Sequence, residues 1–330
     1  MNKAFVFGKF LPFHKGHEAM INFALKKCDF LSVLVCCSDK ETIPAPVRID
    51  WIKKTFDKQS NIEVKEFNYS ETDFPNTSVS SEEVSEIWVP VFKKYFPDYS
   101  TVITSEKYGI YVARLMNIEH IPFDIDRNLI PVSATTIRND LFGNWKFLPN
   151  SVKPYYAIKV VLLGSESTGK TTLTKMLSQH YNCSFVLEAG REIIVDSNSF
   201  SFADLQLVAK EHSKRINNAI VGESPLVIID TDIHITKSYA RFTFGKELDP
   251  GIEIYNSNKA GLYLYLNNDA EYFQDGTRLN EPDRNLLDFS HRQILAEHKI
   301  DYIEIHGNWQ DRFIKAVQLI GQVLSTKSNL

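Results

Sequence analysis

Residues 159–171 read Lys-Val-Val-Leu-Leu-Gly-Ser-Glu-Ser-Thr-Gly-Lys-Thr, a short apolar run followed by a glycine-rich segment. The apolar run predicts a buried strand, and the glycines predict a tight turn whose backbone N–H groups point inward at a phosphate chain. A helix that begins near Lys170 adds the positive end of its dipole. We therefore expect ATP to bind here as a co-substrate, with Lys170 at its β- and γ-phosphates and the Thr171 hydroxyl on Mg²⁺. The residues expected to contact it are Gly164, Ser165, Glu166, Ser167, Thr168, Gly169, Lys170, Thr171 and Thr172.

Short apolar runs alternate with longer amphipathic segments on both sides of this loop, which is typical of parallel sheets with crossover helices. The chain has 330 residues, and domains hold roughly 150 residues each. The periodic spacing of apolar residues along the chain breaks near Trp145–Tyr156. We predict two doubly wound α/β domains, residues 1–150 and 151–330. The expected strands are residues 4–8, 31–38, 62–67, 101–105, 121–124, 158–163, 184–187, 226–230, 262–266 and 302–305. The expected helices include residues 81–96, with a capping box of Ser80 and Glu83, and residues 285–298.

Composition narrows the class of protein. A formal net charge of −4 gives no general attraction to nucleic acid or to membranes. No apolar stretch approaches the roughly 20 residues that span a bilayer, and the N-terminus does not read as a signal peptide. Cys28, Cys36, Cys37 and Cys183 lack zinc spacing and read as reduced thiols. We expect a cytoplasmic protein without a nucleic-acid partner or membrane insertion; a homo-oligomer is possible.

A second motif follows the first expected strand. Residues 8–17 read Gly-Lys-Phe-Leu-Pro-Phe-His-Lys-Gly-His, which places His14 and His17 three residues apart at the start of a helix. Their imidazoles face the same way, toward an anion-binding site. The arrangement suits attack on the α-phosphate of ATP with pyrophosphate leaving, by alignment and charge neutralisation. The alternatives are a zinc site, for which the motif holds no third ligand, and two surface histidines.

A third motif lies at residues 132–138, Val-Ser-Ala-Thr-Thr-Ile-Arg. It predicts a helix start that is capped by hydroxyls, with Arg138 one turn in. Taken alone it is a well-capped helix. Paired with the histidine motif, it places an arginine that bridges the β- and γ-phosphates from the opposite side.

Together, the second and third motifs resemble the nucleotidylyltransferase superfamily, with its His-x-Gly-His turn and later Ser-x-Thr-x-x-Arg turn. The resemblance implies that His14, His17, Ser133, Thr135 and Arg138 contact nucleotide phosphates, with Thr136 on a variable position. Other nucleotide-binding positions expected in this half are Phe7, Gly8, Lys9, Phe10, Gly16, Ser38 and Arg48.

Fusion to a phosphate-loop kinase resembles NadR-type proteins, which join nicotinamide mononucleotide (NMN) adenylyltransferase to ribosylnicotinamide kinase. The resemblance covers nearly the whole chain. It implies ATP, nicotinamide riboside, NMN and NAD as ligands. The chain departs from the family at two points: no DNA-binding extension precedes the first strand, so repressor activity is not expected, and the segment between Ser38 and Arg48 is short.

Carboxylates and arginines of the second half complete the expected kinase site. Asp230 ends a buried strand, where a carboxylate meets Mg²⁺, and Asp232 is a candidate for sharing that role. Glu188 ends the second expected strand and is the first candidate for the base, with Asp230 as the alternative. Arg191 is expected to bind substrate or phosphate. A polar loop with Arg278 and Arg284 resembles a lid, although a solvated loop is nearly as good an interpretation.

These observations predict a bifunctional enzyme of NAD salvage. The C-terminal domain would phosphorylate nicotinamide riboside, and the N-terminal domain would adenylylate the resulting NMN to NAD. Two alternatives stay open: a kinase–nucleotidylyltransferase fusion for a different phosphorylated metabolite, and an ATP- and NAD-binding sensor with weak catalysis.

Overall fold

The computed structural model describes residues 1–75, 81–194, 200–269 and 281–327. It divides into two compact units, Met1–Val152 and a second that begins at Lys153. Each unit has its own parallel sheet, and the two are described separately.

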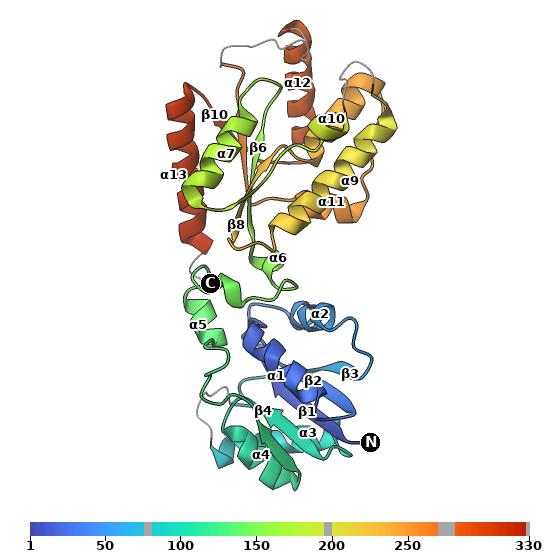
Figure 1. The fold of residues 1–330 in the computed structure, drawn as a ribbon, viewed down its shortest axis with the longest axis vertical. Helices are drawn as coiled ribbons and strands as arrows, with labels where there is room; N and C mark the ends of the chain where they lie inside the picture. The colour runs from blue at the N-terminus through green and yellow to red at the C-terminus, as the bar shows by residue number, and fades with distance from the viewer. Residues whose placement is uncertain (76–80, 195–199, 270–280, 328–330) are drawn as a thin grey trace. The chain divides into compact units, whose positions relative to one another are not determined.

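The first unit is a five-stranded parallel sheet in the order β3-β2-β1-β4-β5. Helices α1 and α2 cover one face, and α3 and α4 pack together on the other (Figure 1). The strand order reverses between β1 and β4, and ligands bind beside such a point at the carboxyl ends of the strands. The bounds are β1 Lys3–Gly8, α1 Lys15–Leu25, β2 Phe30–Ser38, α2 Ala45–Thr55, β3 Ile62–Tyr69, α3 Glu82–Tyr95, β4 Thr101–Thr104, α4 Tyr108–Met116, β5 Glu119–Pro122, α5 Ala134–Asn139 and a 3-10 turn Trp145–Phe147.

Burial on both faces explains the sequences of the central strands. Phe5 of β1 and Leu34 of β2 are fully buried, and they pack with Phe92 of α3 and Val102 of β4 in one core. The ring of Phe5 stacks on that of Phe96 with 4.2 Å between centroids. A strand with helices on both sides becomes continuously apolar, which is the pattern these segments show.

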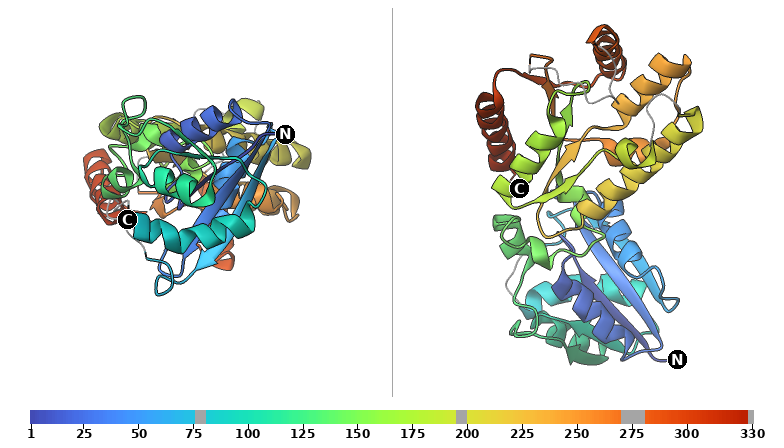
Figure 2. Two further views of the ribbon diagram at one scale, coloured as in Figure 1. Left: turned by 90° about the horizontal axis from the view of Figure 1, so that it is seen from below. Right: turned by 45° about the horizontal axis from the view of Figure 1, so that its top comes forward.

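The second unit is also a five-stranded parallel sheet, in the order β10-β9-β6-β8-β7. Helices α7 and α13 pack together on one side, and α9, α10, α11 and α12 cover the other (Figures 1 and 2). The bounds are α6 Lys153–Tyr156, β6 Ile158–Leu163, α7 Lys170–Tyr181, β7 Ser184–Val186, α8 Gly190–Ile193, α9 Phe202–Ala219, β8 Leu226–Asp230, α10 Ile233–Phe244, α11 Ile252–Asn258, β9 Leu262–Leu266, α12 Glu281–Glu297, β10 Ile303–Ile305 and α13 Trp309–Lys327.

The predicted fold class, two doubly wound α/β sheets, is confirmed. Among the described residues, no helix is long and apolar enough to cross a membrane. The last strand of the first unit was placed two residues late, because β5 runs Glu119–Pro122 and begins with polar residues that pair with β4. The cap of α3 is Ser81, whose hydroxyl accepts from the Val84 N–H at 3.3 Å; Ser80 lies outside the described residues.

Two further differences affect the second unit. Helix α12 begins at Glu281, so Pro282, Asp283 and Arg284 form its first turn and not the polar loop that we predicted. Strand β7 ends at Val186, which leaves Glu188 two residues beyond the strand.

Candidate active sites

The histidine motif of the first unit forms the turn from β1 into α1. His14 is the N-cap of α1, and its Nδ1 accepts from the N–H groups of Gly16 at 3.1 Å and His17 at 3.4 Å. Because Nδ1 is an acceptor there, the proton of the neutral His14 ring is on Nε2. The imidazoles of His14 and His17 stack with 3.7 Å between ring centroids. A Cβ at Gly16 would lie 2.9 Å from the His14 ring, so the turn requires glycine.

Both imidazoles are uncharged. Burial, with the nearby Arg127 cation, lowers the pKa of His14 to about 3. Burial likewise lowers the pKa of His17 far below its usual value, with further contributions from His14 and Arg127. At neutral pH each ring is therefore a neutral imidazole with one N–H donor, and not a cation.

A cavity of about 230 Å³ joins the histidine motif to the later Ser-Ala-Thr-Thr-Ile-Arg motif. The Ser133 hydroxyl caps α5 by accepting from the Thr136 N–H at 3.0 Å. Arg138 donates to the Leu11 carbonyl at 2.5 Å and to the Thr135 hydroxyl at 3.1 Å, which ties the two motifs together. The motif residues on this cavity are Lys9, Phe10, Leu11, His14, Gly16, His17, Val132, Ser133, Ala134, Thr135 and Arg138.

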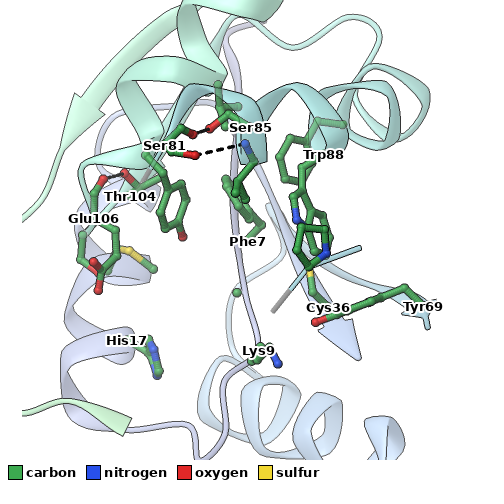
Figure 3. A pocket seen from close by; sticks show the side chains of 18 residues that line it. Phe7, Lys9, His17, Cys36, Tyr69, Ser81, Ser85, Trp88, Thr104 and Glu106 are labelled. Atoms are coloured by element: carbon green, nitrogen blue, oxygen red, sulfur yellow. Dashed lines mark hydrogen bonds between the residues drawn. The ribbon is translucent and has the colours of Figure 1, made fainter. Parts of the chain in front are cut away.

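A second cavity, of about 350 Å³, adjoins the first and shares Lys9, His17, Ser105 and Glu106 with it. Five aromatic side chains are among its lining residues: Phe7, Tyr69, Trp88, Phe92 and Tyr108 (Figure 3). Trp88 lies on α3, across the cavity from His17. A small polar cavity beside an aromatic one suits a phosphate chain next to a planar ring.

Three expected nucleotide-binding residues line neither cavity: Ser38, Arg48 and Thr136. Arg48 is 1% exposed, donates to the Lys9 carbonyl at 2.7 Å and pairs with Glu41 at 2.7 Å. Ser38 donates to Glu71 at 2.6 Å. Arg48 therefore holds the backbone of Lys9, and Ser38 holds Glu71, which pairs with the Lys9 side chain at 3.8 Å.

The sequence reasoning missed residues that carry no motif signal. Arg127 lines the cavity of about 230 Å³ and pairs with Glu106 at 2.8 Å. Its φ is 55°, and nothing in the local sequence indicates this position or this backbone conformation. Trp88 falls in the helix predicted over residues 81–96, to which no site residue was assigned. Trp88 is half-buried in α3, and only the folded structure shows that it lines the cavity across from His17.

The glycine-rich loop of the second unit runs from β6 into α7. Gly164 has a φ of 134°, and a Cβ added there would lie 2.6 Å from the carbonyl oxygen of Leu266. Gly169 has a φ of 90° and precedes α7 as its N-cap. Lys170 is 7% exposed and donates to the carbonyls of Gly164 and Ser165, each at 2.8 Å. Thr168 donates to the Ser165 carbonyl at 2.9 Å, which closes the loop.

Asp230 meets this loop because β8 is the neighbour of β6, with Asp230 opposite Leu162. The Thr171 hydroxyl donates to Asp230 Oδ2, and Asp230 Oδ1 is buried without a hydrogen-bond partner. Burial raises the pKa of Asp230 above its usual value. A hydroxyl and a buried carboxylate oxygen are hard ligands of the kind Mg²⁺ prefers, so Thr171 and Asp230 fit the ion expected here.

The structure also shows the surroundings of the other residues predicted for this site. Glu188 pairs with Arg191 at 3.5 Å. The charge of Glu188 raises the pKa of Asp230 and the charge of Arg191 lowers it, so both residues lie near Asp230 at the same edge of the sheet. Asp232 is engaged elsewhere, because its carboxylate caps α10 and pairs with His234 at 2.5 Å. Arg284 is 2% exposed and donates to Asn268 at 3.0 Å, and Arg278 lies outside the described residues.

Arg312 and Trp309 of α13 were also missed. Arg312 is 1% exposed and donates to the carbonyls of Thr168 at 2.7 Å and Gly307 at 2.8 Å. Trp309 lies against Gly169, where an added Cβ would meet its ring at 2.1 Å. Both residues brace the end of the phosphate loop from a helix more than a hundred residues away.

The fold and the two sites define a class of protein: a nucleotidyltransferase-like sheet joined to a phosphate-loop kinase-like sheet. Residues 4–108 match the family described as the citrate lyase ligase C-terminal domain, and residues 159–312 match the AAA domain family. The solved structure of NadR protein in complex with NR has a TM-score of 0.67 at 21% identity, covering 97% of this chain and 95% of that one. A second, of NadR protein with NAD and AMP-PNP, has a TM-score of 0.65 at 20% identity with the same coverage.

Sequence comparison gives the family. The trifunctional NAD biosynthesis/regulator protein NadR of Escherichia coli is 25% identical over 97% of this chain and 82% of its own length. The nicotinamide-nucleotide adenylyltransferase of Sulfurisphaera tokodaii is 31% identical over 44% of this chain and 84% of its own length. This chain belongs to the nicotinamide-nucleotide adenylyltransferase family and is homologous to NadR over nearly its whole length.

Proposed function

We propose that this chain is a bifunctional transferase of NAD salvage, acting in the cytoplasm. The second unit phosphorylates nicotinamide riboside with ATP, and the first unit adenylylates the resulting NMN to NAD. The observation that carries the proposal is the joined pair of cavities in the first unit, polar at the two motifs and aromatic beyond His17. The phosphate loop supports the kinase half, and the relatives' names supply the pyridine nucleotide.

Adenylyl transfer needs two phosphates brought together and their charge neutralised. We infer that ATP occupies the cavity between the two motifs, with NMN in the aromatic cavity (Figure 3). A phosphate oxygen of NMN attacks the α-phosphorus of ATP, and pyrophosphate leaves with the electrons of the broken P–O bond. The Nε2–H of His14 and the His17 ring stabilise the developing charge, while Lys9 and Arg138 bind the outer phosphates.

Phosphoryl transfer in the second unit uses the loop between β6 and α7. The backbone N–H groups and Lys170 hold the triphosphate. The riboside 5′-hydroxyl attacks the γ-phosphorus, and ADP leaves with the electrons of the broken P–O bond. We assign Glu188 as the group that accepts the hydroxyl proton, because it lies at the same edge as Asp230 and is partly exposed. Arg191 orients Glu188 and supplies positive charge.

Thr171 and Asp230 would hold Mg²⁺, which would neutralise charge on the β- and γ-phosphates. Their own contribution is a fixed pair of oxygens: the Thr171 hydroxyl is directed at Asp230 Oδ2, and Oδ1 is left free for a cation. We do not assign Asp232 to this role, because its oxygens are bound by the start of α10.

Incubation with ATP-Mg²⁺ and a panel of nucleosides and mononucleotides, with detection of products by mass, tests the proposal. Nicotinamide riboside should gain one phosphate, and NMN should be converted to NAD with release of pyrophosphate. Products formed only from other nucleosides would establish a fusion for a different metabolite. Binding of ATP and NAD without turnover would establish a sensor.

A further inference from the structure

A residue with an unusual backbone conformation follows Asp230. Thr231 has a φ of 67°, in the left-handed region, and its side chain is 4% exposed. A β-branched residue rarely adopts this conformation, because its Cβ crowds the backbone. Such a conformation persists only where the surrounding structure holds it in place.

Two hydrogen bonds hold the backbone of Thr231. Its N–H donates to the carbonyl of Leu162 in β6 at 3.0 Å. Its carbonyl accepts from Nε2 of His212 in α9 at 3.2 Å. The first bond fastens the turn to the strand that enters the phosphate loop. The second comes from a helix that contributes no other residue to the candidate site.

The protonation state of His212 follows from this bond. A carbonyl oxygen only accepts, so the ring proton is on Nε2. His212 is 3% exposed, and its buried Nδ1 has no hydrogen-bond partner. Burial lowers the pKa of His212, in keeping with a neutral ring.

The residues on either side of Thr231 show what the turn controls. Asp232 is fixed by α10, because its carboxylate accepts from the N–H groups of His234 at 3.0 Å and Ile235 at 3.3 Å. Asp230 ends β8 and presents its carboxylate to Thr171. Thr231, with its φ of 67°, is the single residue between the end of β8 and the N-cap of α10.

We propose that His212 is a positioning residue of the kinase site: its Nε2–H holds Thr231 in the left-handed conformation and thereby fixes the Asp230 carboxylate beside Thr171. The proposal rests on the kinase function proposed for the second unit. It adds a residue of α9, outside the phosphate loop, to the machinery of that site.

A matched pair of substitutions tests the proposal. The side-chain amide of His212→Gln reaches the position of Nε2, whereas that of the shorter His212→Asn does not. Loss of such an orienting bond lowers metal affinity or activity by about tenfold or more. His212→Asn should lower kcat for riboside phosphorylation to that extent and raise the Mg²⁺ concentration at half-maximal rate. His212→Gln should restore most of both, and adenylylation of supplied NMN should be unchanged in both variants.

Calorimetry of ADP binding, with Mg²⁺ and with EDTA, gives a readout that does not depend on turnover. His212→Asn should lose most of the Mg²⁺-dependent gain in ADP affinity and keep the affinity measured in EDTA. This measurement stands even if wild-type protein phosphorylates no riboside, an outcome that would overturn the proposed function alone.

A double-mutant cycle with Thr231→Gly tests the mechanism. Glycine adopts a positive φ without crowding, so the turn would no longer need His212 to hold it. The loss caused by His212→Asn should therefore be smaller in the Thr231→Gly background. The proposal is overturned if folded His212→Asn keeps the wild-type Mg²⁺ dependence, if His212→Gln is as impaired as His212→Asn, or if the losses in the cycle are additive. His212→Leu replaces His212→Asn should the latter not fold.

Discussion

His14 and His17, whose neutral imidazoles stack on each other, line the cavity between the two motifs of the first unit. Their neutrality follows from burial, which disfavours the charged form of histidine. Neutral donors stabilise the charge that develops in a transition state without holding a substrate phosphate as tightly as cations would. This is the property expected of a site that must release pyrophosphate after each turnover.

The pKa of His14 predicts how stability depends on pH. Between pH 6.5 and about 3, the unfolded chain binds a proton at His14 that the folded chain does not. The free energy of unfolding of the first unit should therefore fall as the pH is lowered through this range. His14→Asn keeps a capping acceptor and does not titrate, so its thermal midpoint should fall less steeply than that of wild type. Equal slopes for the two proteins would show that His14 is not a buried neutral histidine.

The two carboxylates of the kinase site are separable by experiment. Glu188→Gln should lower kcat for riboside phosphorylation with little change in ATP-Mg²⁺ affinity, because a base acts on the substrate. Asp230→Asn should instead shift the Mg²⁺ concentration needed for half-maximal rate, because Asp230 Oδ1 is the free oxygen beside Thr171. Titration of Mg²⁺ on both variants decides between the roles, and the reverse pattern would exchange them.

At the scale of elements, the two sites are turns held by distant helices. The phosphate loop is braced by Arg312 and Trp309 of α13, and the histidine turn is tied to α5 through Arg138. Both braces bring together segments far apart in the sequence. The loops therefore keep their shape through side-chain contacts as well as through their glycines.

Gly169→Ala tests the brace on the phosphate loop. Gly169 and Gly245 have φ values of 90° and 61°, but only Gly169 would place a Cβ against another residue, 2.1 Å from the Trp309 ring. We expect Gly169→Ala to lower the free energy of unfolding by up to about 1 kcal/mol more than the control Gly245→Ala, because the added methyl displaces the ring of Trp309, which is 46% exposed. Chemical denaturation measures the difference. Trp309→Ala in the Gly169→Ala background should remove most of it, and no recovery would contradict the contact.

The local sequence pattern predicted most of the fold and part of the two candidate sites. The run from β6 through the glycine-rich loop into α7 was predicted from sequence because apolar periodicity, glycines and lysine agree there. Strand β5 was misplaced because it begins with Glu119 and His120, whose pairing with β4 is a tertiary effect. Asp232 was read as a metal candidate because sequence spacing does not show that its oxygens cap α10. Arg127, Trp88 and His212 needed the packed structure, since each acts through a neighbour distant in the chain.

At the scale of the whole molecule, the candidate residues for each of the two reactions lie within one unit. The histidine motif and its cavities lie within Met1–Val152, and the phosphate loop, Glu188 and Asp230 lie in the unit that begins at Lys153. We propose that these units are the two catalytic domains. A substitution in one unit should therefore remove one reaction and leave the other. Because the product of the kinase is the substrate of the adenylyltransferase, NMN released by one variant should diffuse to the other and be converted there.

Complementation between two variants, each impaired in one of the two activities, tests this account most directly. Lys170→Ala should form no NMN from nicotinamide riboside and ATP, yet convert supplied NMN to NAD at the wild-type rate. His17→Ala should convert the riboside to NMN and slow adenylylation by about 100-fold or more, as when one charge-stabilising donor is removed. A mixture of the two variants, followed by mass detection of NAD, should again make NAD from the riboside. Loss of both reactions in either folded variant would mean that the two activities share one site and would contradict the account.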